Sequence, residues 1–159
     1  MKKIKPAKPR APKRKNPKRK INAQHKRRRA SHSQQHSPAL PRGLAATIER
    51  VVPFEWTIAA YDAHLPAVFS TPAMIALMEI AAAQAIQPHL PEGFISVGTR
   101  IEVDHLKAVP QGATVQASAR LSGNAERFLV FEVEALSGEI TVGRGKVYRA
   151  IVELARFQK

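Results

Sequence analysis

The sequence predicts an α+β domain in which a five-stranded antiparallel sheet packs against one long apolar helix. Three observations lead to this fold class. One apolar run carries a helix start signal and continues to Pro88. Four extended stretches separated by short turns follow this run, and a fifth precedes it. The economical packing for this order of elements places the helix on one face of a single sheet.

The first predicted strand covers Ala45–Ile58, which is rich in alternating and β-branched residues. A loop over Ala59–Ser70 follows it. Thr71 and Pro72 predict the helix start, because threonine is a good N-cap and proline fits the first helical position. The helix is apolar nearly all round, as is typical of a central helix, and ends before the next proline.

The stretches after the helix alternate apolar and polar residues, as half-buried strands do. They are Ser96–Val109, Ala113–Leu121, Arg127–Ala135 and Glu139–Leu154. The alternation in the first stretch places Thr99, Ile101, Val103 and His105 on one face, which should be the core face.

Short turns separate these four strands and predict that neighbours in sequence pair as antiparallel strands. The turns are Pro110–Gly112, Ser122–Asn124 and Ser137–Gly138. Gly143 and Gly145 predict a bulge or bend in the last strand.

The charge of the chain is concentrated at its N-terminus. Residues 1–42 hold 16 of the 26 lysines and arginines, none of the 12 acidic residues and no aromatic residue. We therefore predict a disordered basic tail over residues 1–42 and one folded domain over residues 43–159. The tail is either a solubilising arm or an electrostatic contact for nucleic acid. Without aromatic side chains to stack on bases, any such contact should be non-specific.

Several classes of protein are excluded or disfavoured. The 159 residues contain no cysteine, so disulfides, thiolate metal sites and cysteine nucleophiles are absent, and a reducing location such as the cytoplasm fits. The only stretch worth testing as a membrane span, Ala67–Gln87, contains a central carboxylate that costs about 2.5–3.5 kcal/mol in a bilayer. We therefore expect a soluble protein without a membrane partner. No phosphate-binding loop or nucleophile elbow occurs, and His64, His89 and His105 have no metal-ligand spacing. His32 and His36 are four residues apart, which is only a weak metal signal in a disordered tail, so no cofactor or metal is expected.

Glu79 is the only charged residue between Leu65 and Pro88. An ionised carboxylate among apolar side chains is costly unless it is paired, and such surroundings are how proteins tune a general base or acid. The plainer alternative is that Glu79 lies on the one hydrated stripe of its helix.

Two other residues could carry chemistry. His105 is either a satisfied core histidine or an imidazole that orients a carboxylate, a water or a carbonyl. Thr71 is either a helix cap or a hydroxyl placed where a helix N-terminus stabilises developing negative charge. Thr71 and Glu79 are about 12 Å apart along a helix axis. A site that uses both therefore needs substrate between them or a second subunit.

The runs VFSTPAMIALMEIAAAQAI and LPEGFISVGTRIEVDHLKAVPQGATV resemble the hotdog-fold thioesterases of the fluoroacetyl-CoA thioesterase type. The resemblance covers roughly Phe54–Phe157, and its most specific parts are Leu-Met-Glu in the helix and S-V-G-T-x-x-x-x-x-H. It implies a hotdog fold, a homodimer and active sites at the dimer interface. It also implies a catalytic set and a substrate-binding pair, which are Thr71, Glu79 and His105, and Gly98 and Thr99.

The implied activity is hydrolysis of a small or medium acyl-CoA. The paired phenylalanines that gate the fluoroacetyl enzymes would fall in Asp62–Leu65, which here reads Asp-Ala-His-Leu. This departure implies a broader acyl-CoA hydrolase. The alternative from another class is a non-catalytic acyl-CoA- or nucleic-acid-binding dimer, in which the body is a scaffold and the tail makes the contact.

Overall fold

The computed structural model describes residues 40–41 and 43–158, so nearly all of the predicted tail lies outside the described residues. The elements that build the sheet and its helix are β1 (Ala45–Val51), α2 (Thr71–Ile86), β2 (Phe94–His105), β3 (Thr114–Ala125), β4 (Phe128–Ser137) and β5 (Ile140–Glu153). Short 3-10 turns connect them or follow them, namely η1 (Phe54–Trp56), η2 (Ile58–Ala60), η3 (Gln87–His89) and η4 (Leu154–Arg156).

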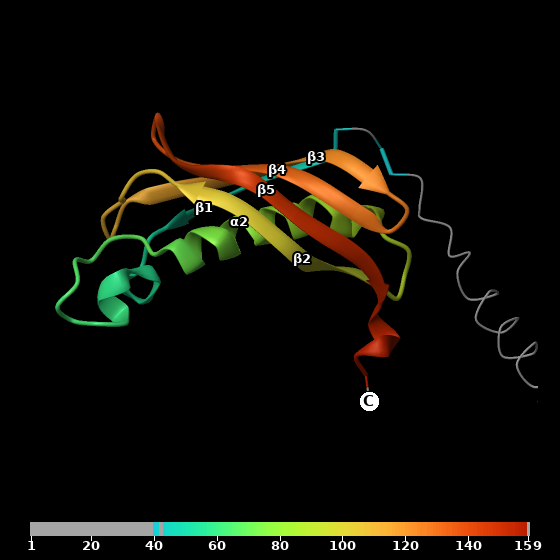
Figure 1. Cartoon of the computed structure of the whole chain (residues 1–159), viewed down its shortest axis with the longest axis horizontal. Coiled ribbons are helices and arrows are strands. Elements are labelled where there is room, and N and C mark those ends of the chain that lie inside the picture. The colour runs from blue at the N-terminus through green and yellow to red at the C-terminus, as the bar shows by residue number, and fades with distance from the viewer. Residues whose placement is uncertain (1–39, 42, 159) are drawn as a thin grey trace, which may run out of the picture. The chain divides into compact units, whose positions relative to one another are not determined.

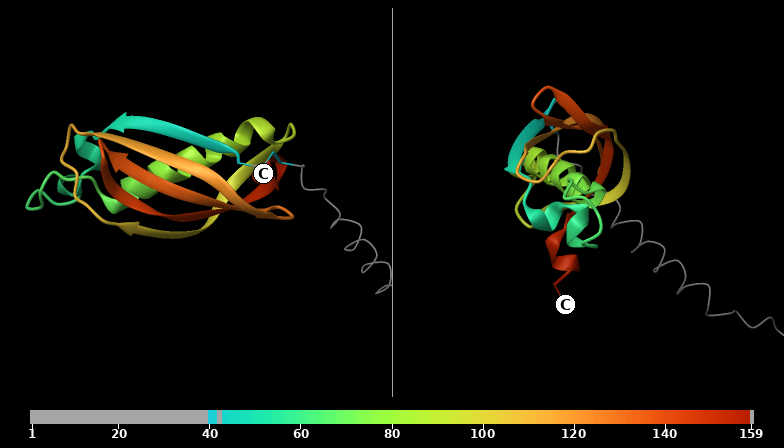
Figure 2. Two further views of the ribbon diagram at one scale, coloured as in Figure 1. Left: turned by 90° about the horizontal axis from the view of Figure 1, so that it is seen from above. Right: turned by 90° about the vertical axis from the view of Figure 1, so that its left-hand side faces the viewer.

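The five strands form one antiparallel sheet in the order β1-β3-β4-β5-β2. The sheet curves around α2, which lies along its inner face (Figures 1 and 2). The predicted fold class, a five-stranded antiparallel sheet wrapped around a central helix, is confirmed. The two strands at the edges of the sheet are β1 and β2.

The core lies between α2 and the concave face of the sheet. Small residues on both sides let the helix approach the strands closely, because alanine adds little thickness to a packed layer. The buried alanines of this core are Ala81, Ala82 and Ala85 on the helix, and Ala117, Ala119 and Ala135 on the sheet. Larger side chains fill the remaining space, among them Met74, Leu77, Met78, Leu129 and Phe131.

Three predicted boundaries are wrong, and one of them is the end of the strand predicted over Ser96–Val109, which stops at His105. The first strand ends at Val51 rather than Ile58, because Pro53 has no N–H to continue the ladder and the chain enters η1. The predicted turn at Ser122–Asn124 is part of β3, whose register shifts between Leu121 and Gly123. The hairpin turn lies instead between Ala125 and Phe128, which pair across the two strands.

The predicted pairing of sequence neighbours fails at one place. β2 pairs with β5, not with β3, although the connection between β2 and β3 is short and contains the predicted turn at Pro110–Gly112. Val68 and Phe69, just before α2, bond to this connection, because Val68 bridges to Pro110 and the Phe69 N–H donates to the Val109 carbonyl. The connection therefore crosses the end of the domain, where α2 begins.

The predicted irregularity in the last strand is confirmed. The β4–β5 register shifts where Ala135 opposes Gly143 and Leu136 opposes Thr141.

Among the described residues, no helix is long and apolar enough to span a bilayer.

Candidate functional site

The N-terminus of α2 and the end of β2 bring Thr71 and His105 together. Thr71 Oγ1 lies 2.9 Å from His105 Nδ1. The other ring nitrogen, Nε2, lies 3.0 Å from the backbone carbonyl oxygen of Lys107. The two residues that the sequence singled out separately are thus hydrogen-bonded partners.

Ser70, rather than Thr71, is the N-cap of α2. The Ser70 side chain is fully buried and accepts a hydrogen bond from the Ala73 N–H, at 3.4 Å. The prediction of Thr71 as the cap is therefore wrong by one residue. Serine and threonine are both good N-caps, but only Ser70 has the extended backbone that a cap requires. Since Ser70 caps the helix, the Thr71 hydroxyl is available to the imidazole.

The partners of the His105 ring define its protonation pattern. A carbonyl oxygen can only accept, so the contact with Lys107 requires a proton on Nε2. In a neutral imidazole Nδ1 is then the acceptor, and the Thr71 hydroxyl donates to it. A hydroxyl that donates to an oriented imidazole is the arrangement by which enzymes activate an alcohol or a water.

The Glu79 carboxylate lies at a second position, farther along α2. Its side chain is 30% exposed, and Oε1 lies 3.5 Å from the Arg149 guanidinium. On its other side the carboxylate packs against Gly98 of β2, where a Cβ atom would overlap Oε1. Glycine is therefore required at position 98 as long as the carboxylate occupies this place.

A β-bulge lets both halves of the site face the helix. Gly98 opposes Arg149 and Arg100 opposes Tyr148, so Thr99 is an extra residue on β2. Gly98 lies before the bulge and His105 lies after it, and both face α2. In a regular strand, residues separated by an odd number of positions point to opposite faces, so Gly98 and His105 could not share a face without the bulge. A single inserted residue thus brings both onto one face.

Thr99 does not lie on the core face with Ile101, Val103 and His105, contrary to the sequence-based alternation. It is exposed, and its hydroxyl donates to the Tyr148 carbonyl oxygen at 3.2 Å. The bulge is the reason, because the predicted face assumed a regular strand. Of the predicted substrate-binding pair, Gly98 therefore lies beside Glu79, and Thr99 is engaged with β5.

Sequence reasoning missed two residues of the site, Arg149 and Ser96. Both are buried, and the guanidinium donates to Ser96 Oγ at 3.0 Å and to the Ser96 carbonyl oxygen at 2.8 Å. A signal was present, since Arg149 alternates with Val147 and Ile151, which are apolar and should face the core. An arginine in that series needs hydrogen-bond acceptors and a negative charge, which Ser96 and Glu79 supply.

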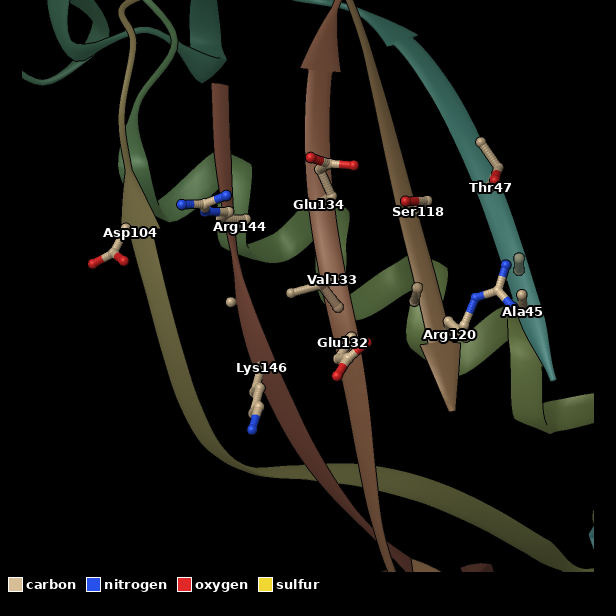
Figure 3. Close-up of a pocket in the computed structure, with 13 residues that line it drawn as sticks. Ala45, Thr47, Asp104, Ser118, Arg120, Glu132, Val133, Glu134, Arg144 and Lys146 are labelled. Atoms are coloured by element: carbon tan, nitrogen blue, oxygen red, sulfur yellow. The ribbon is translucent and has the colours of Figure 1, made fainter. Parts of the chain in front are cut away.

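A hollow of about 550 Å³ lies on the opposite face of the sheet (Figure 3). It contains none of the predicted catalytic residues. Its charged side chains alternate in sign across paired strands, as Asp104, Arg144 and Glu134 do in one row. Such rows stabilise an exposed sheet face, so we assign no ligand to this hollow.

A smaller hollow of about 260 Å³ lies next to the start of α2. It is lined mainly by apolar side chains from η1, from Tyr61 just after η2 and from the helix, among them Trp56, Ala73, Ala76 and Ile80. Within the described ranges, no group of three or more histidine or acidic side chains could hold a metal ion.

Comparison with known proteins places this geometry in a family. The model of the fluoroacetyl-CoA-specific thioesterases matches residues 52–155, which is most of the folded domain. The chain belongs to this family. The predicted resemblance is therefore confirmed, and so is the predicted enzyme class, a thioester hydrolase.

Individual relatives agree with this membership. The fluoroacetyl-CoA thioesterase of Streptantibioticus cattleyicolor is 40% identical over 95 residues, which cover 60% of this chain and 68% of that protein. A solved structure of a fluoroacetyl-CoA thioesterase has a TM-score of 0.71 at 35% identity and covers 76% of this chain and 93% of its own. A thioesterase superfamily member from Thermus thermophilus has a TM-score of 0.69 at 28% identity, covering 74% and 88%.

Proposed function

We propose that this protein hydrolyses the thioester bond of a small or medium acyl-CoA. The observation that carries the proposal is the hydrogen bond between Thr71 and His105 at the start of a helix. Family membership supports thioester chemistry. A solved relative with 35% identity holds fluoroacetate and CoA, which supports an acyl-CoA as the substrate.

In the proposed reaction His105 Nδ1 accepts the proton of the Thr71 hydroxyl as its oxygen attacks the thioester carbonyl. The carbon–sulfur bond then breaks, and the imidazolium returns the proton to the departing CoA thiolate. A water activated by a Glu79 carboxylate hydrolyses the resulting ester and restores the Thr71 hydroxyl. Donor groups near Gly98 are the proposed stabilisers of the oxyanion.

A homodimer is part of this proposal, because one protomer leaves its catalytic groups apart. Eight residues of helix separate Thr71 from Glu79 by about 12 Å. The stripe of α2 that the sheet does not cover is mainly apolar, with Gln84 as a polar member, and Ile80 on it is 44% exposed. A two-fold partner that covers this stripe would run antiparallel to it and could bring Glu79 of the partner subunit toward Thr71.

The acyl group is proposed to occupy the smaller hollow beside the start of α2. Its lining is mainly apolar, and its volume of about 260 Å³ suits a short aliphatic chain. The loop at Asp62–Leu65, which differs from the gate of the fluoroacetyl enzymes, is polar and locally tied, because the Asp62 carboxylate accepts from the His64 N–H at 2.9 Å. These features support a broader acyl range than fluoroacetyl alone.

Two further parts of the proposal rest on the sequence. The basic residues 1–42 are proposed to contact nucleic acid weakly and without sequence preference. The cytoplasm is the proposed location, since the chain contains no cysteine. The non-catalytic alternative is not favoured, because the named relatives are thioesterases.

The decisive experiment is an acyl-CoA hydrolysis screen across chain lengths with Glu79→Gln as the paired variant. This substitution keeps the shape of the side chain but removes its ability to accept a proton. General-base assistance is typically worth about 10²–10⁴-fold, so kcat should fall by that order with little change in KM. An unchanged kcat on a well-hydrolysed acyl-CoA would overturn the assignment.

A further inference from the structure

Arg149 of β5 is a buried cation beneath the catalytic helix. Only 6% of its surface is exposed. Burial of an unpaired charge is strongly unfavourable, so a guanidinium at this place must be matched by hydrogen-bond acceptors and a negative charge. Its partners therefore indicate what the residue is for.

Those partners connect α2 to β2. Nε donates to Ser96 Oγ at 3.0 Å and Nη2 to the Ser96 carbonyl oxygen at 2.8 Å. Nη1 donates to the Glu79 carbonyl oxygen at 3.3 Å and lies 3.5 Å from Glu79 Oε1. The strand anchors two of the guanidinium nitrogens, and the third reaches both the backbone and the carboxylate of Glu79.

The same carboxylate oxygen is confined from the opposite side. Gly98 pairs directly with Arg149 across β2 and β5, and its missing side chain leaves the space that Oε1 fills. Oε1 is thus held between a cation and a backbone. Oε2 accepts no hydrogen bond from any residue that the structure describes, and the side chain is 30% exposed.

We infer that Arg149 is the positioning residue for Glu79, holding Oε1 against Gly98 so that Oε2 faces the substrate or the attacking water. This inference rests on the proposed function, because it assigns Glu79 the role of proton acceptor. In this inference Arg149 acts on the reaction through Glu79. Ser96 holds the guanidinium in place through two hydrogen bonds and is therefore part of the same positioning arrangement.

The electrostatics agree with this geometry. Burial lowers the pKa of Arg149 from its usual value, and the negative charge of Glu79 counteracts part of that effect. The two charges support each other, so removing either one disturbs the position of the other.

The test compares substitutions on β5 in two backgrounds. Arg149→Met gives a side chain of similar length without the charge. Arg149→Lys keeps the charge but lacks the planar guanidinium, which donates from several nitrogens at once. Arg144→Met is the matched control, because Arg144 is exposed on the same strand and lines the outer face. A misplaced catalytic group costs about 10²-fold, so Arg149→Met should lower kcat by that order with KM nearly unchanged. The kcat of Arg149→Lys should lie between those of Arg149→Met and the parent protein, and the kcat of Arg144→Met should equal that of the parent.

The second background is Glu79→Gln. If Arg149 acts through Glu79, Arg149→Met should cause no further loss of kcat once the carboxylate is gone. A merely structural arginine would lower the active fraction equally in both backgrounds. Equal kcat losses in both, or an unchanged kcat for folded Arg149→Met in the parent, would overturn the inference.

Folding is controlled by a thermal midpoint on each preparation. Should Arg149→Met fail to fold, Arg149→Lys and Ser96→Ala carry the same comparison, and each should lower kcat in the parent background only. The two proposals fail in different ways. If Glu79→Gln leaves kcat unchanged, the proposed function fails; if Glu79→Gln lowers kcat but the Arg149 and Ser96 variants do not, the positioning role alone fails.

Discussion

Thr71 and His105 are 34 residues apart in sequence, and their side chains meet in a hydrogen bond of 2.9 Å. The bond depends on two local features that no single motif contains. Ser70 caps α2, which leaves the threonine hydroxyl available, and the bulge at Thr99 turns the end of β2 toward the helix. The nucleophile and the base of the proposed reaction are therefore assembled by the meeting of a helix start with a strand end.

Thr71→Val should remove the nucleophile while preserving the shape of the side chain. We expect kcat to fall by about 10²–10⁴-fold, as for Glu79→Gln, and His105→Ala to cause a comparable loss. Thr71→Ser is the matched control and should retain most of the activity, because it keeps the hydroxyl. Steady-state kinetics on one acyl-CoA measures all three, and a loss below about tenfold for Thr71→Val would indicate direct attack by water.

Gly98→Ala should disable the site through one methyl group. The added Cβ would overlap Glu79 Oε1, so the carboxylate must move and kcat should drop by about 10²-fold. Gly123→Ala is the control, because a Cβ there would meet only Val130 atoms, at ordinary contact distances of 3.8 and 3.9 Å. Kinetics and thermal midpoints on both variants separate the two effects, and equal activity in the two would contradict the packing of Glu79 against Gly98.

Ile80→Glu should dissociate the proposed dimer. The side chain lies on the uncovered apolar stripe of α2, where a buried carboxylate would be unpaired in an interface. Sedimentation or light scattering should report twice the 17.5 kDa chain mass for the parent and the single mass for the variant. Ile140→Glu is the control, since Ile140 is exposed at the β4–β5 hairpin. A parent protein that is monomeric at micromolar concentration would contradict the shared site.

Deletion of residues 1–36 should abolish nucleic-acid binding and leave hydrolysis nearly intact. The deletion stops short of Leu40 because Leu40 packs against the core of the domain. Binding by the full chain to single- and double-stranded oligonucleotides should be indifferent to sequence and fall steeply with salt, since it depends on counterion release. Fluorescence anisotropy at several salt concentrations measures this, and binding that survives the deletion would place the contact in the folded domain.

The sequence by itself determined the elements of this protein and its central carboxylate. The helix was predictable because an apolar run between Pro72 and Pro88 is a local pattern, and the strands because alternation is local too. Glu79 was identifiable for the same reason, as the one charge in that run. The concentration of basic residues in the first 42 positions is likewise a property of composition alone.

Only the tertiary structure decided how these elements meet. Strand order, the separation of β2 from β3 and the pairing of β2 with β5 depend on contacts between distant residues, which no local pattern encodes. The same is true of the bulge at Thr99 and of Arg149, whose partners are 53 and 70 residues away. The partly buried pair of Arg149 and Glu79 forms only when the helix, the strands and the side-chain-free Gly98 are packed together. The free energy of that packing exists only in the folded protein.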